Sequence, residues 1–263
     1  MSATRTRPRV VIDQRIAERR AEVRQQRRRR RLRRTLVVLG LAALVAGFVA
    51  IERSALVGLE EVEVHGTQRL DPAEVETAAD LELGTSTLRL GLDDAADRVT
   101  ALPLVQQAQA RRLDPLTVAI TVEERQPAVA VTADGVRLAV DREGVVLFEG
   151  APDGLTAIAA SGPPPEVGDT VDDHPALANA HEAWRSLSGP LRAQVDRYVA
   201  EGPDELRLEL TSGIDVRFGR ADRVDEKVRA LGAVLADIGD APVRTVDVRA
   251  PATPVVVGAD EQP

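Results

Sequence analysis

The sequence contains no cysteine and only one lysine, one tryptophan, one tyrosine and three phenylalanines. The absence of cysteine excludes disulfides, thiolate metal sites and a cysteine nucleophile. Any folded region must therefore be stabilised by ordinary core burial, which a chain of this length can provide. The shortage of aromatic side chains also disfavours sites that stack nucleobases or sugars.

Residues suited to catalysis or metal binding are equally scarce. Two of the three histidines, His174 and His181, lie on or beside one predicted helix. Their spacing separates them by about 10 Å along the helix axis, too far to share one Zn²⁺ with bonds of about 2.1 Å. The sequence has no Gly-x-Ser-x-Gly motif and no glycine-rich phosphate loop. We therefore expect no enzymatic activity, no cofactor, no metal site and no small-molecule substrate.

Charge is distributed very unevenly along the chain. Residues 1–34 contain fourteen arginines and three acidic residues, which gives 14 − 3 = +11. The remainder carries 20 − 39 = −19, and the two parts sum to the net charge of −8. Regions of such opposite charge belong in different environments. Residues 1–34 are too polar to form a core, so we expect a disordered cytoplasmic tail there.

One long apolar run follows the arginine-rich segment. Residues 35–51 are seventeen consecutive uncharged residues, which as a helix would be about 26 Å long, at the lower limit for a membrane span. A cleaved signal peptide is the alternative interpretation, but the leader is long and no small-x-small cleavage site follows the run. We predict an uncleaved transmembrane helix over residues 35–53.

The arginines before this run determine the predicted orientation. They crowd one end of the span, whereas Arg53 is almost alone at the other end, so the positive-inside rule places the N-terminus in the cytoplasm. We expect the same arginines to contact inner-membrane lipid. Nucleic-acid binding is the other interpretation, but interleaved aromatics and a folded nucleic-acid-binding domain are lacking. The residues assigned to topology and the membrane surface are Arg28, Arg29, Arg30, Arg31, Arg33 and Arg34.

The first region beyond the span reads β-α-α-β-β. Residues 59–64 alternate as a half-buried strand, and Asp71 and Pro72 begin a helix as its N-cap and first helical residue. A second helix begins at Asp93, and two further strands are expected over residues 105–112 and 116–122. A three-stranded sheet covered on one face by two helices is the economical fold for that order.

The second region is predicted to be a mixed β-sheet with two helices, so that the fold class of the chain is α+β. One helix follows Pro175 and is interrupted at Gly189-Pro190, and the other covers residues 221–238 with one apolar face. Residues 152–170 are rich in glycine and proline, and we expect them to be irregular. Strands are expected at residues 129–132, 136–140, 145–148, 195–201, 205–210, 214–219 and 245–249.

Several motifs are similar to those of a known family. They are the start Val62-Glu63-Val64-His65-Gly66, the exit Glu124-Arg125-Gln126-Pro127-Ala128, the hairpin at residues 138–145, and the closing series of residues 213–219, Lys227 and residues 246–249. Together with the element order, these motifs resemble the FtsQ/DivIB cell-division family. The resemblance covers residues 35 to about 257. It implies a tail (1–34), a transmembrane helix (35–53), a POTRA domain (57–125), an FtsQ-type β domain (126–257) and a disordered C-terminal tail (258–263).

The resemblance implies a non-enzymatic scaffold of the bacterial divisome. Such a scaffold links early and late cell-division proteins and docks an FtsB/FtsL-type complex, and thereby controls septal peptidoglycan synthesis. FtsW/FtsI-type proteins are further candidate partners. The implied location is the cell (inner) membrane, as a single-pass protein enriched at the division septum. Nucleic acid is not expected as a partner.

The same resemblance places partner binding on the last strand of the second domain. A strand at a sheet edge has unpaired N–H and C=O groups that can accept a partner strand. A proline at Val248 is then expected to block binding without unfolding the domain, and Pro251 and Pro254 are expected to shorten or bulge the pairing. That residues 245–249 form an ordinary sheet strand stays open. The partner-binding residues assigned are Val246, Asp247, Val248, Arg249, Ala250, Val255 and Val256.

Two other functions are weighed against this one. The first is a POTRA-containing membrane-anchored transport or chaperone component. It would require repeated POTRA units or a following barrel of alternating strands, and the sequence shows neither. The second is a membrane-anchored cell-wall hydrolase, which would require a catalytic constellation that the sequence does not offer.

Overall fold

The computed structural model describes residues 33–50, 58–239 and 241–259. The first described segment is a helix, Arg33–Ala50, which is long and apolar enough to cross a membrane by length and composition. It begins two residues before the predicted span, and its side chains are not buried within the described protein. Arg33 and Arg34 form its first turn, whereas Arg28–Arg31 and the predicted end of the span at residues 51–53 lie outside the described residues.

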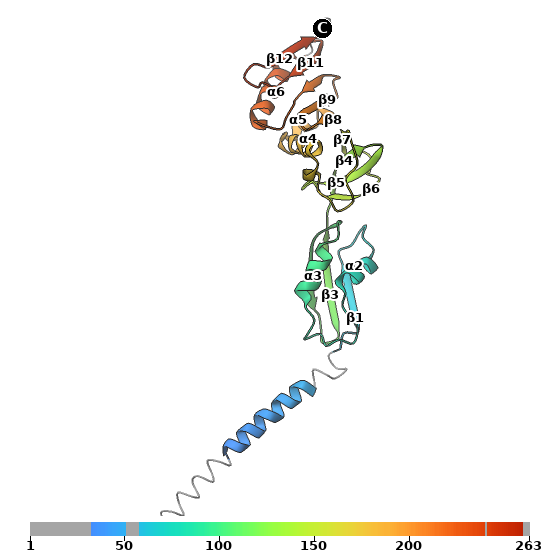
Figure 1. Ribbon diagram of the computed structural model, residues 1–263, viewed down its shortest axis with the longest axis vertical. Helices are drawn as coiled ribbons and strands as arrows, with labels where there is room; N and C mark the ends of the chain where they lie inside the picture. Colours follow the sequence, from blue (N-terminus) through green and yellow to red (C-terminus); the bar gives the residue numbers. More distant parts are fainter. Residues whose placement is uncertain (1–32, 51–57, 240, 260–263) are drawn as a thin grey trace, which may run out of the picture. The chain divides into compact units, whose positions relative to one another are not determined.

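The first folded domain has the predicted β-α-α-β-β order (Figure 1). Its three strands pair in the order β1-β3-β2, so the last strand in sequence lies in the middle of the sheet. Helix α3 packs on β2, and α2 packs against α3. The elements are β1 (Glu61–His65), α2 (Pro72–Ala79), α3 (Leu92–Thr100), β2 (Val105–Arg112) and β3 (Thr117–Glu124).

Local signals account for the start and end of α2. The Asp71 carboxylate accepts a hydrogen bond of 3.0 Å from the Ala73 N–H, and Pro72 occupies the first turn, where its missing N–H is not needed. Asp80 ends the helix in the left-handed conformation, with its N–H bonded to the Thr77 carbonyl. The N-terminus of α2 therefore forms as the sequence predicts.

The second domain contains a mixed nine-stranded sheet in the order β12-β11-β10-β9-β8-β7-β4-β5-β6 (Figure 1). The pairs β10–β11, β4–β7 and β7–β8 are parallel, and the others are antiparallel. The first strands are β4 (Pro127–Ala133), β5 (Val136–Asp141), β6 (Val146–Glu149) and β7 (Thr156–Ala160). They are followed by β8 (Val195–Gly202), β9 (Glu205–Leu210), β10 (Asp215–Arg217), β11 (Val243–Asp247) and β12 (Val255–Gly258).

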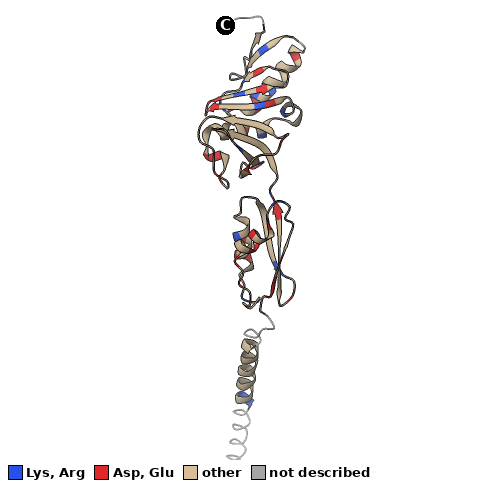
Figure 2. Ribbon diagram, turned by 90° about the vertical axis from the view of Figure 1, so that its right-hand side faces the viewer, with Lys and Arg blue, Asp and Glu red and all other residues tan. Residues whose placement is uncertain are grey.

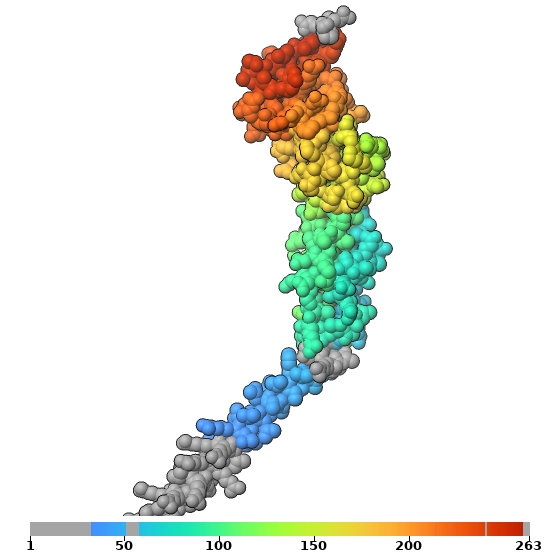
Figure 3. Space-filling model, viewed as in Figure 1, coloured from blue at the N-terminus to red at the C-terminus, as the bar shows by residue number. Residues whose placement is uncertain are grey.

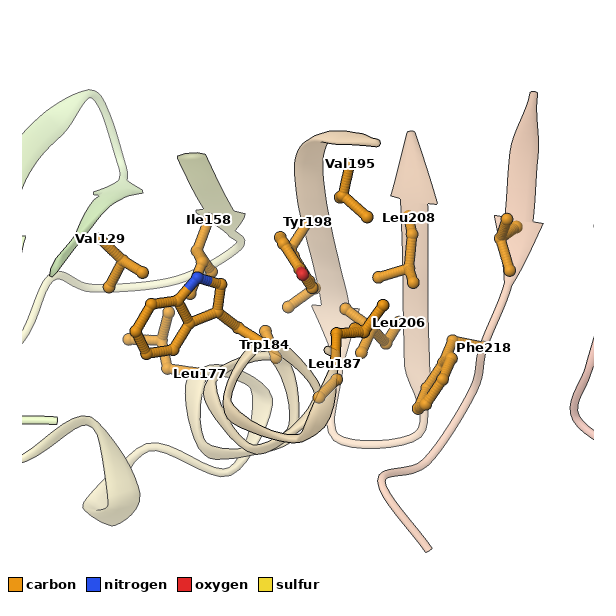
Figure 4. Packing of buried hydrophobic residues seen from close by; sticks show 14 of the residues in the cluster. Val129, Ile158, Leu177, Trp184, Leu187, Val195, Tyr198, Leu206, Leu208 and Phe218 are labelled. Atoms are coloured by element: carbon orange, nitrogen blue, oxygen red, sulfur yellow. The ribbon is translucent and has the colours of Figure 1, made fainter. Parts of the chain in front are cut away.

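One face of this sheet is covered by helix α4 (Pro175–Ser186), which packs on β7, β8 and β9 and also touches α6 (Val224–Ile238). The main hydrophobic core lies between α4 and this face of the sheet. Trp184 of α4 and Tyr198 of β8 are buried side by side with Ile158, Leu206 and Leu208 (Figure 4). The first helix is interrupted, but earlier than predicted: α4 ends at Ser186, and Gly189-Pro190 begin a one-turn helix α5 (Gly189–Arg192). The α+β fold class is thus confirmed, with the N-terminal apolar helix, the β-α-α-β-β domain and the mixed sheet.

The expectation that residues 152–170 are irregular is wrong in one respect. Strand β7 lies within this segment and pairs in parallel with β4 on one side and β8 on the other. Its sequence, Thr-Ala-Ile-Ala-Ala, has only Thr156 and Ile158 as strand formers, and the other three residues are alanines. The pairing on both sides, rather than intrinsic propensity, therefore makes this segment a strand.

Candidate partner-binding edge of the large sheet

The last strand of the large sheet is β12, not residues 245–249 as the sequence suggested. Strand β11 lies between β10 and β12, and it pairs in parallel with β10 and antiparallel with β12. In the second pair Val246 lies opposite Val256, and Asp247 lies opposite Val255. Strand β12 is therefore the edge strand of the sheet, and β11 has a neighbouring strand on each side.

This arrangement corrects the expectation for Val248. The Val248 N–H donates a hydrogen bond of 3.0 Å to the Arg217 carbonyl, and the Val248 side chain is fully buried. A proline at this position would remove that bond and disturb the core, so it would not leave the domain intact as expected. Val246 is likewise fully buried and belongs to the hydrophobic core.

Two of the assigned valines are exposed on β12. Val255 is 56% exposed and Val256 is 39% exposed, which places them among the most exposed large apolar side chains in the two folded domains. The Arg244 guanidinium donates to the Ala259 carbonyl (2.7 Å) and so helps to hold the end of β12 on β11. The sequence missed β12 as a strand because four residues show too little alternation.

The two prolines lie in the connection between β11 and β12. Ala250 accepts a hydrogen bond of 3.0 Å from the Thr253 N–H, which closes a turn, and Pro251 is buried within it. Pro254 directly precedes β12. Neither proline therefore interrupts the β11–β12 ladder, and the one irregularity in this pair lies at its other end, between Val243 and Thr245.

Arg249 projects from the end of β11 and is held by Asp247. The Arg249 Nε lies 3.0 Å from each oxygen of the Asp247 carboxylate. The Arg249 backbone N–H also donates to this carboxylate, at 3.0 Å. The Arg249 guanidinium is the main reason that the pKa of Asp247 is lowered, and partial burial of the carboxyl opposes it. The Arg249 side chain is nevertheless 58% exposed, so it can meet a partner.

The loop after β10 packs directly beside Arg249. Gly219 has a φ of +72°, and a Cβ there would lie 2.9 Å from the Arg249 Cγ. The Phe218 and Gly219 N–H groups both donate to the Leu206 carbonyl at 2.9 Å. Asn179 of α4 holds the same loop from the other side, because its amide donates to the Gly219 carbonyl at 3.0 Å and accepts from the Ala221 N–H. This close approach explains the glycine in the closing motif.

A polar pocket of about 270 Å³ opens beside this loop. It brings together three acidic residues and three arginines from the β8–β9 hairpin, β10 and the end of β11. Charges of both signs also alternate over these strands in Figure 2. Its lining residues are Glu201, Asp204, Glu205, Leu206, Arg207, Arg217, Gly219 and Arg249. Sequence reasoning assigned only Arg249 to this place, because the other charged residues are far from it along the chain.

The exit motif between the two domains has a structural role. The Glu124 carboxylate accepts hydrogen bonds from the Gln68, Arg69 and Leu70 N–H groups at 2.6 to 3.1 Å. Burial alone would raise the pKa of Glu124, but these three donors outweigh it and the pKa is lowered. Arg125 bonds the buried Asp141 carboxylate at 2.6 Å. The motif residues thus hold loops and turns in place.

The histidines do not form a metal site in the part of the chain that the structure describes, where no group of three or more His, Asp or Glu residues is placed to hold a metal ion. His181 is buried, and its ring stacks on Trp184 with a centroid distance of 5.7 Å. Burial lowers the pKa of His181, and the nearby Asp172 opposes this shift. His174 is instead the N-cap residue of α4.

Two family models match the chain over most of its folded length. The model described as "POTRA domain, FtsQ-type" matches residues 57–125, and the model described as "Cell division protein FtsQ/DivIB, C-terminal" matches residues 128–249. Together they cover 69 + 122 = 191 of the 263 residues.

Curated relatives with the name "Cell division protein FtsQ" are similar over most of the chain. The protein of Mycobacteroides abscessus is 32% identical over 227 residues, which are 85% of this chain and 69% of that protein. The protein of Mycolicibacterium smegmatis is 33% identical over 230 residues, 85% of this chain and 66% of its own length. The protein of Streptomyces bingchenggensis is 32% identical over 233 residues, which are 85% of this chain and 86% of that protein. The chain thus spans about two thirds of the mycobacterial relatives.

Two solved structures show weaker likeness. The major extracytoplasmic domain of the cell-division protein DivIB from Geobacillus stearothermophilus aligns with a TM-score of 0.31 at 16% identity, over 43% of this chain and 93% of that chain. The POTRA1-2 region of Omp85 from Anabaena aligns with a TM-score of 0.24 at 23% identity, over 30% of this chain and 53% of that chain.

Proposed function

This chain belongs to the FtsQ/DivIB family of cell-division proteins, and we propose that it is a non-enzymatic scaffold of the bacterial divisome. In this role it links early and late cell-division proteins and docks an FtsB/FtsL-type complex through its second domain. The docking controls septal peptidoglycan synthesis by positioning the proteins that carry it out. FtsW/FtsI-type proteins are further proposed partners.

The proposed topology rests on charge and hydropathy. The helix Arg33–Ala50 anchors the chain in the inner membrane, and the fourteen arginines of residues 1–34 keep the N-terminus in the cytoplasm. Residues 57–125 and 126–257 then lie on the outer side as a POTRA domain and a β domain. Their strongly acidic composition, 19 − 36 = −17 over residues 57–257, agrees with an environment different from that of the tail.

One observation carries the docking proposal: the large sheet ends in the short strand β12, which presents two exposed valines. A partner segment that pairs with β12 would extend the sheet by one strand and gain main-chain hydrogen bonds. Val255 and Val256 would supply apolar contacts to that segment. Arg249 lies at the neighbouring end of β11, where its exposed guanidinium could pair with a carboxylate of the partner.

A photo-crosslinking experiment in dividing cells tests this proposal. A photoreactive amino acid is placed at Val256 on β12 and, as a matched control, at the exposed Glu149 on β6, which forms the opposite end of the sheet. We expect the FtsB-type protein to be captured from position 256 and not from position 149. Capture from β6 alone, or an intact complex that yields no product from β12, would show that the partner uses a different surface.

A further inference from the structure

Three exposed leucines gather in two loops of the first domain. Leu83 is 67% exposed, Leu88 is 53% exposed and Leu113 is 45% exposed. They are the only leucines among the exposed large apolar side chains of the two described domains, where the others are valines. Single exposed apolar residues need no explanation, but a group of three at one place does.

The loop that carries Leu83 and Leu88 is attached to the residues at which the chain enters the domain. The Gly84 N–H donates to the Leu59 carbonyl at 2.7 Å, and the Leu59 N–H donates to the Thr85 carbonyl at 2.9 Å. Gly58 also forms a β-bridge with Ser86. Residues 82–90 therefore lie beside the first described residues of the domain.

The β2–β3 turn that carries Leu113 is attached at the same place. The Glu60 N–H donates to the Leu116 carbonyl at 2.8 Å, and the Thr87 hydroxyl donates to the Pro115 carbonyl at 2.8 Å. The two loops are thus joined to each other and to the chain entry. All three leucines lie on this one end of the domain, which we call the entry end.

The length of chain before the entry end limits its distance from the membrane. The apolar helix ends at Ala50, and Gly58 follows eight residues later. Even a fully extended chain of eight residues spans at most about 28 Å. If the helix crosses the bilayer, the entry end must therefore stay within that distance of the point at which the helix leaves it.

The charges of the entry end indicate an apolar contact and not an electrostatic one. Exposed acidic groups there are Glu60, Glu61, Glu82 and Asp114, and exposed arginines there or close by are Arg89, Arg111 and Arg112. Such a mixture gives no basic patch that would bind anionic lipid by charge. The leucine side chains are therefore the groups at this end whose transfer out of water is favourable.

We propose that Leu83, Leu88 and Leu113 insert into the headgroup boundary of the outer leaflet and hold the entry end against the bilayer. Three side chains are far too small an area for a stable protein interface, which needs about 1,000 Å² or more. A tethered contact needs little affinity of its own, because a short linker gives an effective concentration in the millimolar range. The inference rests on the proposed membrane anchor and would fix where the domain stands above the bilayer.

Spin labelling of the full chain in phospholipid vesicles tests the inference, and the natural absence of cysteine makes it direct. Nitroxide labels are placed singly at Leu83→Cys, Leu88→Cys and Leu113→Cys. Leu44→Cys within the apolar helix reports whether the span is inserted. Val167→Cys, whose parent side chain is as exposed as that of Leu113, is the matched control in the other domain. Circular dichroism verifies the fold of each variant.

We expect the ratio of oxygen to nickel-chelate collisions at the three leucine positions to shift from the aqueous value of Val167 toward the value of Leu44. In addition, Leu83→Ser with Leu88→Ser should return a label at position 113 to the aqueous value. Aqueous values at all three positions with a lipid value at Leu44 would overturn the inference and leave the anchor standing. An aqueous value at Leu44 would overturn the anchor itself. A lipid value at position 113 that survives the serine substitutions would show that the leucines do not drive the contact.

Discussion

At the scale of single residues, the two cations Lys227 and Arg249 both lie beside the loop after β10, but the first is buried and the second is exposed. Lys227, the only lysine, is buried on α6, and its ammonium donates to the Arg220 carbonyl at 2.6 Å and to Asp222 at 2.7 Å. Its charge is thereby satisfied inside the fold, as a buried charge must be. Arg249 lies on the other side of the same loop with most of its side chain exposed. Lys227 therefore supports the loop, and Arg249 is the group available to a partner.

The substitution Arg249→Glu should weaken binding of the FtsB-type partner. It places an anion beside Asp247, where a carboxylate of the partner would meet repulsion in place of attraction. We expect the affinity to fall roughly tenfold, or about 1.4 kcal/mol. Isothermal titration of the purified pair measures the change. The substitution also removes the ion pair with Asp247, so we expect a modest loss of unfolding free energy, which denaturant unfolding measures separately.

The control for this prediction is Arg137→Glu. Arg137 lies on β5 toward the opposite end of the sheet and is also an exposed, ion-paired arginine, bonded to Asp153 at 3.2 Å. An equal loss of affinity in both variants would mean that net charge, and not the position of Arg249, is responsible.

At the scale of elements, the connection between β1 and α2 depends on a residue from another strand. Glu124 at the end of β3 accepts three N–H groups from residues 68–70, which lead into the N-cap of α2. These donors belong to a loop that has no strand or helix of its own to satisfy them. One carboxylate thereby fixes the start of α2 relative to the central strand of the small sheet.

The substitution Glu124→Gln should cost about 1.5–3 kcal/mol of unfolding free energy at neutral pH, because three charge-assisted hydrogen bonds are weakened. The folded state lowers the pKa of Glu124, so its contribution is present above the unfolded value of 4.5 and is lost as the pH falls through the folded value. The difference between wild type and variant should therefore shrink on acidification. Denaturant unfolding at pH 7 and near pH 3 measures it.

The neighbouring Glu123 provides the matched control, because it is exposed on the same strand. Glu123→Gln should change the unfolding free energy by less than about 0.5 kcal/mol at either pH. If the two variants behaved alike, the hydrogen bonds to the loop would not be the source of the stability.

At the scale of the whole molecule, the parts follow one another as an apolar helix, a β-α-α-β-β domain and a mixed-sheet domain. The residues from β10 onward form an outer part of the second domain, coloured orange to red in Figure 3. The proposed docking strand thus lies in the last part of the described chain, and the proposed anchor lies in its first part. Each end of the described chain is assigned to a different partner: lipid at one, protein at the other.

A fluorescent protein fused to the N-terminus should concentrate at midcell shortly before septation. The expected cause is binding to other division proteins through the folded domains, since we expect the helix alone not to direct the protein to midcell. A fusion to residues 1–57 only is the control, and it should stain the membrane evenly. Even staining by the full chain in dividing cells would contradict the proposed scaffold role.

Several features could be predicted from the sequence because their causes are local. The apolar run of residues 35–51 and the cap and proline that begin α2 each depend on a few neighbouring residues. The motifs that resemble the FtsQ/DivIB family also lie in continuous segments, and the family matches confirm them. The arginine bias around the span gave an orientation, which stays a prediction.

Other features were decided only in the tertiary structure. Strand β7 exists because β4 and β8 lie on both sides of it, and the sheet ends at β12 and not at residues 245–249 because β12 pairs with β11. The bond from Val248 to Arg217 and the packing of Gly219 against Arg249 join residues about thirty positions apart. A sequence states which segments can become strands, but which strand is left at the edge depends on how all the strands pair, and that choice is non-local.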